Sequence, residues 1–158
     1  MITGYSAECA IQQAINQDNR IKRSPITRSL VFKAIPTHPY FKKKSQIVSE
    51  FLKQEYGVPT INEKGLRRTY LDWDNVPTNV ILDRVFGVDF SLNLLGHSIA
   101  IDATTDPNKV SQKIVKLKKV TTVLPYDHAI VILVQTRKIE KLFSILKQNR
   151  REKLITIA

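Results

Sequence analysis

The sequence is poor in cysteine, in glycine and in long apolar runs, and each shortage excludes a class of protein. Cys9 is the one cysteine among 158 residues, which excludes an internal disulfide and a cysteine-rich zinc site. Only five residues are glycine and 42% are hydrophobic, which favours a folded chain over a disordered one. No stretch reaches the roughly 18 apolar residues of a membrane span, and the start MITGYSAECA lacks the pattern of a signal peptide. We expect an intracellular protein, cytoplasmic or nucleoid-associated, with no membrane partner.

Acidic residues are also scarce, and they are missing altogether from one long segment. The chain has 25 Lys and Arg against 14 Asp and Glu, a formal charge of +11. Residues 20–44 contain eight cations and no acid. Such a balance favours a polyanion as partner, and we expect double-stranded DNA. The candidate nucleic-acid-binding residues are Arg20, Lys22, Arg23, Arg28, Lys33, Lys42, Lys43, Lys44 and Lys109.

The first half of the chain gives mixed signals for secondary structure. Helical spacing of apolar residues predicts a helix capped by Ser6 and ended at Asp18, and a second helix over about 43–56. The segment 26–35, ITRSLVFKAI, is rich in β-forming residues and is expected to be a strand or hairpin arm. Residues 58–77 are expected to be irregular or to form short helices, and Thr78 is expected to cap a helix that ends near Gly87. The length fits one domain, residues 1–158, with a basic arm or insertion at about 20–77.

The second half has a clearer pattern. Two partly alternating apolar runs, VDFSLNLL and SIAIDATT, flank Gly96-His97 and predict a hairpin. Asp106-Pro107 is typical of a helix start, and that helix is expected to extend to about Lys119. A central strand over 129–135, a helix over about 138–150 and a last strand over 154–158 follow. These elements predict an α/β fold with a mixed central β-sheet flanked by helices.

Two aspartates of the predicted hairpin are candidates for a shared site. Strand alternation sets Asp89 against Val88 and Phe90, and sets Asp102 against Ile99 and Ile101. Carboxylates paired beside apolar strands repel each other unless a cation lies between them. Mg²⁺ is the usual cation where the protein ligands are oxygens and the substrate contributes phosphate oxygens. The alternative is that both are solvated acids at strand ends with no shared role.

This arrangement resembles the PD-(D/E)xK superfamily of restriction-like nucleases. The resemblance rests on residues 79–135 and the first helix, with Asp89 and Asp102 at the positions of the two motif acids and Glu8 similar to an acid on an early helix. It implies a restriction-endonuclease-like core. It also implies a Mg²⁺ (or Mn²⁺) ion held by Asp89, Asp102, the carbonyl of Ala103 and Glu8.

The chain departs from the motif at its lysine, because Thr104 occupies that position. Lys109, Lys113 and Lys116 form a stripe along the following predicted helix, and members of the superfamily show such a relocated lysine. Lys113 is the first candidate for the catalytic role and Lys116 the second. A lysine stripe beside an apolar stripe is also typical of any amphipathic helix.

The resemblance and the charge together predict a DNA endonuclease of the restriction, homing or junction-resolving type. Such enzymes commonly act as homodimers or homotetramers, because two strands need two active sites. Two alternatives remain open. One is a non-catalytic DNA-binding protein with a degenerate nuclease fold, and the other is an RNA-binding protein whose basic segments coat phosphate.

Overall fold

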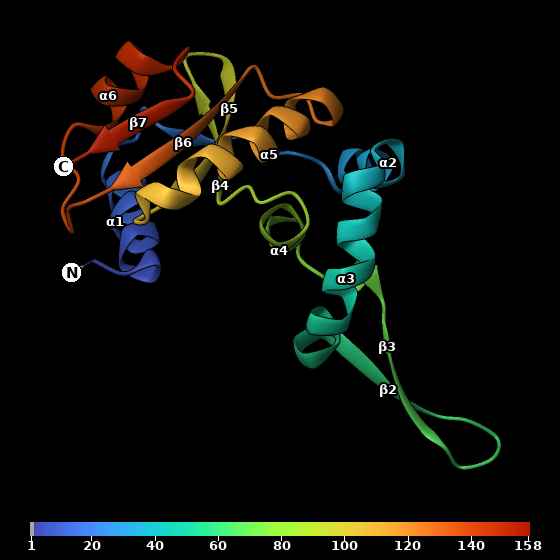
Figure 1. The fold of residues 1–158 in the computed structure, drawn as a ribbon. Helices are drawn as coiled ribbons and strands as arrows, with labels where there is room; N and C mark the ends of the chain where they lie inside the picture. Colours follow the sequence, from blue (N-terminus) through green and yellow to red (C-terminus); the bar gives the residue numbers. More distant parts are fainter. Residues whose placement is uncertain (1) are drawn as a thin grey trace.

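A mixed five-stranded sheet forms the centre of the molecule, in the order β1-β4-β5-β6-β7 (Figure 1). The computed structural model describes residues 2–158. The strands are β1 (Lys22–Arg23), β4 (Phe90–Leu94), β5 (His97–Thr104), β6 (His128–Val134) and β7 (Leu154–Ile157). The pairs β1–β4 and β4–β5 are antiparallel, and the pairs β5–β6 and β6–β7 are parallel. The predicted α/β class, with a mixed sheet flanked by helices, is confirmed.

Helices cover both faces of this sheet, each with its own apolar core. The helices are α1 (Gly4–Gln17), α2 (Arg28–Thr37), α3 (Pro39–Tyr56), α4 (Thr78–Arg84), α5 (Val110–Val123) and α6 (Leu142–Asn149). Two short 3-10 turns, η1 (Trp73–Asn75) and η2 (Pro107–Lys109), precede α4 and α5. On one face α1 and α6 pack against Ile99, Ile101 and Ile132. On the other face α5 and α4 pack against Ala100 and Val131, and α2 and α3 extend the same core outward.

The β4–β5 hairpin has the alternation that the sequence predicts. Ile99 and Ile101 face α1 and α6, whereas Ala100 and Asp102 lie on the α5 side. The turn is one residue earlier than expected, at Leu95-Gly96, and both residues have positive φ (52° and 83°). Consecutive positive φ angles are the geometry of a type I′ turn, which matches the twist of the two strands.

The predicted central strand and the helix before it are also confirmed. Asp106 opens the helical segment by accepting a hydrogen bond from the Asn108 N–H at 2.9 Å. The helix α5 then crosses from β5 to the parallel neighbour β6, which is paired on both edges.

The segment 26–35 is a helix and not the expected strand, so that prediction is wrong. Thr27 caps α2 by accepting a hydrogen bond from the Leu30 N–H at 3.3 Å. Val31 and Ala34, three residues apart, are both buried. Their burial against the α3–α4 core outweighs the β propensity of the segment, which is a weaker local preference.

The expectation of irregular structure or short helices over 58–77 is wrong for residues 58–71, which form a hairpin, whereas residues 72–77 contain the short helix η1 as expected. The strands β2 (Gly57–Ile61) and β3 (Arg67–Leu71) pair antiparallel in a second, two-stranded sheet. β2 begins directly at the C-terminal cap of α3, Gly57. A Cβ on Gly57 would collide with the Lys53 carbonyl oxygen and with the Thr69 methyl, so only glycine allows helix and hairpin to meet this closely.

Several helix boundaries differ by a few residues from those expected. The cap of α1 is Thr3 and not Ser6, and α4 begins at Thr78 after Pro77 without a side-chain cap. α3 starts four residues early because Pro39 suits the first helical position and His38 accepts from the Tyr40 N–H. α6 is shorter than expected at Leu142–Asn149.

The segment between β1 and β4 extends to one side of the sheet. In Figure 1 α4 lies between the sheet body and α3, and the β2–β3 hairpin projects beyond α3 at the lower right. Within residues 2–158, none of the helices has the length and the apolar character required to cross a membrane.

Candidate active site

Asp102 is the buried centre of the candidate site. Its side chain is 2% exposed, and both carboxylate oxygens accept charged hydrogen bonds from α5. Lys113 Nζ donates to Oδ1 at 2.8 Å and Lys116 Nζ donates to Oδ2 at 2.5 Å. Two ammonium groups therefore meet one carboxylate in a largely buried place, where charge-assisted hydrogen bonds are strong.

The spacing on α5 explains why both lysines reach this carboxylate. Lys113 and Lys116 are three residues apart, so they lie on the same face of the helix. α5 follows β5 after a short connection and crosses over the strand, with Leu117 in the core beside them. Lys109, the third member of the predicted stripe, is exposed in η2 and does not contact Asp102.

Asp89 precedes β4 and lies next to Asp102. Phe90 pairs with Ile101, so the register continues to Asp89 beside Asp102. The Ala103 N–H donates to Asp89 Oδ2 at 2.8 Å. Burial, followed by the negative charge of Asp102, raises the pKa of Asp89 to about 8 despite that hydrogen bond. The structure thus brings the two predicted acids together and makes the charge of Asp89 costly.

Gly87 controls the path of one of the lysines. It has a positive φ of 68°, and a Cβ there would collide with Cδ, Cε and Nζ of Lys116. The Lys116 side chain therefore passes directly over the Gly87 backbone on its way to Asp102. From the sequence Gly87 is expected only to end a helix, and the positive φ that is common at a helix end is the signal for it.

Glu8 lines a cleft that opens onto Asp89. This cleft has a volume of about 330 Å³, and Arg23 and Asn79 also line it. An adjoining cleft of about 350 Å³ shares Arg23, Asn79 and Asp89. Burial raises the pKa of Glu8, Asp83 and Asp102 raise it further, and Lys113 opposes the rise. Glu8 is thus within electrostatic reach of both Asp102 and Lys113.

Of the four predicted metal ligands, Asp89 and Asp102 fit a divalent cation best. Mg²⁺ and Mn²⁺ prefer oxygen ligands, and a cation would relieve the repulsion that raises the pKa of Asp89. Ala103 is half-buried beside Asp102 in β5. Across residues 2–158, no three or more His, Cys, Asp or Glu side chains form a group able to hold a metal ion, so Glu8 does not complete a three-acid ligand set, although its charge reaches both aspartates.

Some of the cations predicted to bind nucleic acid are engaged within the protein. Arg20 pairs with Asp18 at 2.7 Å and lies over the Phe143 ring. Arg28 donates to the backbone carbonyls of Trp73 at 2.8 Å and Val76 at 2.6 Å. Arg28 therefore holds α2 to the segment before α4, and this contact explains why a cation is needed there.

The other predicted cations are more accessible. Arg23 donates to Gln12 Oε1 at 2.7 Å at the edge of the Asp89 cleft. Lys44 is half-buried beside α4. Arg20 and Arg23 are exposed despite their contacts, and the exposed lysines of the set are Lys22, Lys33, Lys42, Lys43 and Lys109. These lysines are spread over β1, α2, α3 and η2 and do not form a single arm.

A second group of exposed cations is not among the predicted nucleic-acid-binding residues. Lys64, Arg67 and Arg68 belong to the β2–β3 hairpin, and all three are exposed. The available signal was the pair of short β-forming runs, VPTI and RRTYL, on either side of Asn62 and Gly65.

Comparison with protein-family models, with curated proteins and with solved structures found no match to this chain in any of the three. Functional inference therefore rests on the geometry of the site.

Proposed function

We propose that this chain is a metal-dependent DNA endonuclease with a core of the restriction-endonuclease type. The observation that carries the proposal is the convergence of Lys113 and Lys116 on Asp102, at 2.8 and 2.5 Å, beside Asp89. It supplies paired carboxylates and ammonium groups in one place, although Thr104 replaces the lysine that the resemblance predicts. A helix, an acid-bearing hairpin, a crossover helix and a parallel strand surround the pair in the expected order.

The residues divide the proposed chemistry between them. Asp89 and Asp102, with the carbonyl of Ala103, would hold Mg²⁺ or Mn²⁺. When bound, that ion would activate a water and neutralise phosphate charge during an in-line displacement. Lys116 is fixed over Gly87 and is assigned to balancing the charge of Asp102. Lys113, whose Nζ lies 2.8 Å from Asp102 Oδ1 and whose side chain is partly exposed, is assigned to stabilising the negative charge that develops on the phosphate.

The basic surface supports DNA as the substrate. The exposed lysines of α2, α3 and η2 add to a net charge of +11, which attracts a polyanion. Cutting both strands requires two active sites, so we expect a homodimer or homotetramer.

A non-catalytic DNA-binding protein is the second candidate, and a specific observation favours it. Both oxygens of Asp102 are already bonded to ammonium groups, and Glu8 does not join the aspartates as a third ligand. In that case the lysines would serve only to neutralise a buried acid.

Nicking of supercoiled plasmid in Mg²⁺ or Mn²⁺ separates the two candidates. We expect nicked product from the unaltered chain and none from Asp89→Asn or Asp102→Asn, with DNA binding retained by both. Lys113→Ala should lower the rate by about 10² or more, the cost of losing a preorganised transition-state charge.

Lys118→Ala is the matched control, because Lys118 is exposed on the same helix and does not contact Asp102. It should cut at the unaltered rate. DNA binding without metal-dependent product would favour the non-catalytic candidate, and stronger binding to structured RNA than to duplex DNA at equal salt would favour an RNA partner.

A further inference from the structure

The β2–β3 hairpin is a solvent-exposed ribbon. Every residue from 59 to 70 is exposed, including three large apolar side chains: Ile61 at 69%, Leu66 at 55% and Tyr70 at 48%. In Figure 1 the ribbon projects away from the sheet body beyond α3. Its base, at Gly57, Val58 and Leu71, is partly buried next to α3. The exposed part beyond this base adds little to the packing of the described chain.

The ribbon is nevertheless well ordered by its own contacts. Its strands are paired without interruption, from the pair of Gly57 with Leu71 at the base to the pair of Ile61 with Arg67 near the tip. At the tip, Asn62 Oδ1 accepts from the Lys64 N–H at 3.0 Å and from the Leu66 N–H at 2.9 Å. Gly65 provides the positive φ of 78° that closes the loop. Binding would therefore cost little additional ordering of the backbone.

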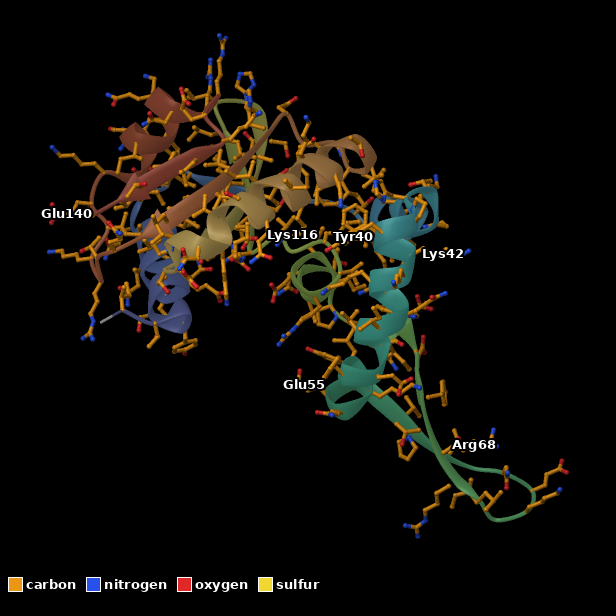
Figure 2. All side chains as sticks on the ribbon, in the orientation of Figure 1. Tyr40, Lys42, Glu55, Arg68, Lys116 and Glu140 are labelled. Atoms are coloured by element: carbon orange, nitrogen blue, oxygen red, sulfur yellow. The ribbon has the colours of Figure 1, made fainter. Side chains whose placement is uncertain are left out.

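The charge of the ribbon points to an anionic partner. Residues 59–70 contain three cations, Lys64, Arg67 and Arg68, against one acid, Glu63, a net charge of +2. Within residues 2–158 none of the three cations takes part in an ion pair. Figure 2 shows Arg68 on the ribbon, well separated from Lys116 on α5.

We propose that the β2–β3 hairpin enters the major groove of duplex DNA and reads its sequence, an inference that rests on the proposed endonuclease function. Two strands about 4.8 Å apart, with their side chains, fit a groove about 12 Å wide. Each strand has five residues, which at about 3.3 Å per residue is close to half a turn of DNA in length.

Strand alternation divides the side chains into two faces with separate tasks. Arg68 shares a face with Thr60 and Tyr70, whereas Arg67 shares the other with Ile61. The first face has three hydrogen-bonding side chains and is assigned to the base edges, with the Arg68 guanidinium directed at guanine. Arg67 and Lys64 are assigned to the phosphates.

A contact between two copies of the chain is less well supported. In a two-fold symmetric contact each ribbon would face its own copy, which would bring like charges together. DNA neutralises the same cations, and the ring of Tyr70, on the face assigned to the base edges, can contact thymine methyl groups.

Binding of a pool of duplexes with randomised sequence tests the proposal. Arg68→Ala should relax the sequence preference at a guanine position and weaken binding to the preferred sequence by roughly 5- to 150-fold. Arg67→Ala and Lys64→Ala should weaken binding to all sequences alike, and each should flatten the slope of log K against log salt by about 1. Lys147→Ala, which removes an exposed cation from α6 at the opposite end of the molecule, should change neither quantity.

A shortened ribbon gives the decisive comparison. Replacing residues 59–69 by Asn-Gly joins the paired residues Val58 and Tyr70 through a two-residue turn and keeps the base of the hairpin. We expect this variant to keep its melting temperature and to nick DNA at saturating enzyme, but to lose sequence preference and affinity.

The possible outcomes separate this inference from the proposed function. Unchanged affinity and salt slope in a shortened variant that still nicks DNA would overturn the groove assignment and leave the endonuclease proposal intact. Reduced self-association without a change in DNA affinity per protomer would assign the ribbon to a protein contact. Loss of RNA binding alone would assign it to RNA, and failure of the unaltered chain to bind duplex DNA would overturn both proposals.

Discussion

At the scale of single residues, the candidate site consists of four ionisable side chains in a largely buried position: Asp89, Asp102, Lys113 and Lys116. Asp102 is balanced by two lysines, whereas Asp89 accepts a hydrogen bond from the Ala103 N–H and lies against the Asp102 carboxyl group. The lysines therefore relieve one acid while the other keeps a pKa of about 8. An aspartate that is protonated near neutral pH destabilises the folded state when its proton is removed, unless a cation takes the place of that proton.

We expect Asp89→Asn to stabilise the protein in a pH-dependent way. At pH below about 4 both folded and unfolded states carry a protonated Asp89, so the substitution should have little effect. Between pH 4 and the folded-state pKa of about 8, only the unfolded state releases its proton, so wild-type stability falls as pH rises. The advantage of Asn should grow through this window to about 1 kcal/mol or more, or about 2–4 °C in melting temperature.

Thermal unfolding at pH 4.5, 6.5 and 8.5 without divalent ions measures this effect. Addition of Mg²⁺ at pH 8.5 should stabilise the wild type and not the variant, because a ligand that binds only the folded state raises its stability. A constant difference between the two proteins across this range would contradict the raised pKa.

We expect Gly87→Ala to act through Lys116. The added methyl group occupies the space of the Lys116 side chain, so Lys116 should be displaced from Asp102. In a Lys116→Ala background that collision is absent, and the cost of Gly87→Ala should be smaller by about 0.5–3 kcal/mol. A double-mutant cycle in urea measures this coupling.

Gly96→Ala is the matched control, because Gly96 also has a positive φ, 83°, but no neighbouring atom within 4 Å of an added Cβ. It should carry only the backbone cost, which is about 1–2 kcal/mol, and no coupling to Lys116. Equal coupling for both glycines would show that backbone strain alone accounts for the result.

At the scale of elements, the segment between β1 and β4 shows how a basic residue can serve the fold and not a ligand. Arg28 was predicted to contact DNA because it lies in the acid-free segment. Its guanidinium instead joins the first turn of α2 to the carbonyls of Trp73 and Val76. These carbonyls belong to the irregular chain around η1, and the Trp73 carbonyl also accepts from the Val76 N–H at 3.1 Å, so Arg28 adds a charged donor there.

We expect Arg28→Ala to lower stability and not the salt dependence of DNA binding. Removing two charge-assisted hydrogen bonds to partly buried carbonyls should cost about 1–3 kcal/mol. Lys33→Ala on the same helix is the control, since Lys33 is exposed. It should leave the melting temperature unchanged and flatten the salt slope by about 1 if it contacts a phosphate. A flattened slope without a loss of stability for Arg28→Ala would restore Arg28 to the DNA interface.

At the scale of the whole molecule, one apolar core joins the sheet to the helices between β1 and β4. Phe41 of α3 is fully buried, and the centroid of its ring lies 4.7 Å from the ring centroid of Phe86, which follows α4. The same cluster continues to Ala100 and Val131 in the central strands. Lys119 of α5 also lies over the Tyr40 ring at 4.4 Å, a second link between α5 and α3.

We expect the chain to unfold in a single transition that depends on this link. Phe41→Ala should lower stability by about 3–5 kcal/mol, the usual cost of removing a buried phenyl group. Because the core is continuous, calorimetry and circular dichroism should report one coincident transition in both proteins. A variant that loses α3 helicity first and keeps a cooperative sheet would show that the helices between β1 and β4 fold as a separate unit.

Local patterns in the sequence determined the strands β4 to β7 and placed the two acids on one hairpin, whereas the short edge strand β1 was not predicted. The alternation of the β4–β5 hairpin, the apolar run of β6 and the Asp106 cap depend on neighbouring residues, so each could be predicted from the chain. The spacing of Lys113 and Lys116 predicted that they share a face of α5. What that face contacts depends on the crossover from β5 to β6, and only the tertiary structure decided it.

Tertiary packing also decided the structure of residues 26–71. Val31 and Ala34 are buried in a core supplied by distant residues, and this burial outweighs the β propensity of their segment. The β2–β3 ribbon was missed for a different reason, because its exposed residues give only a weak hydrophobic pattern. Its position beyond α3 depends on the close contact at Gly57. The sequence could therefore indicate that cations are abundant, but their position relative to Asp89 and Asp102 depends on contacts between residues far apart in the chain.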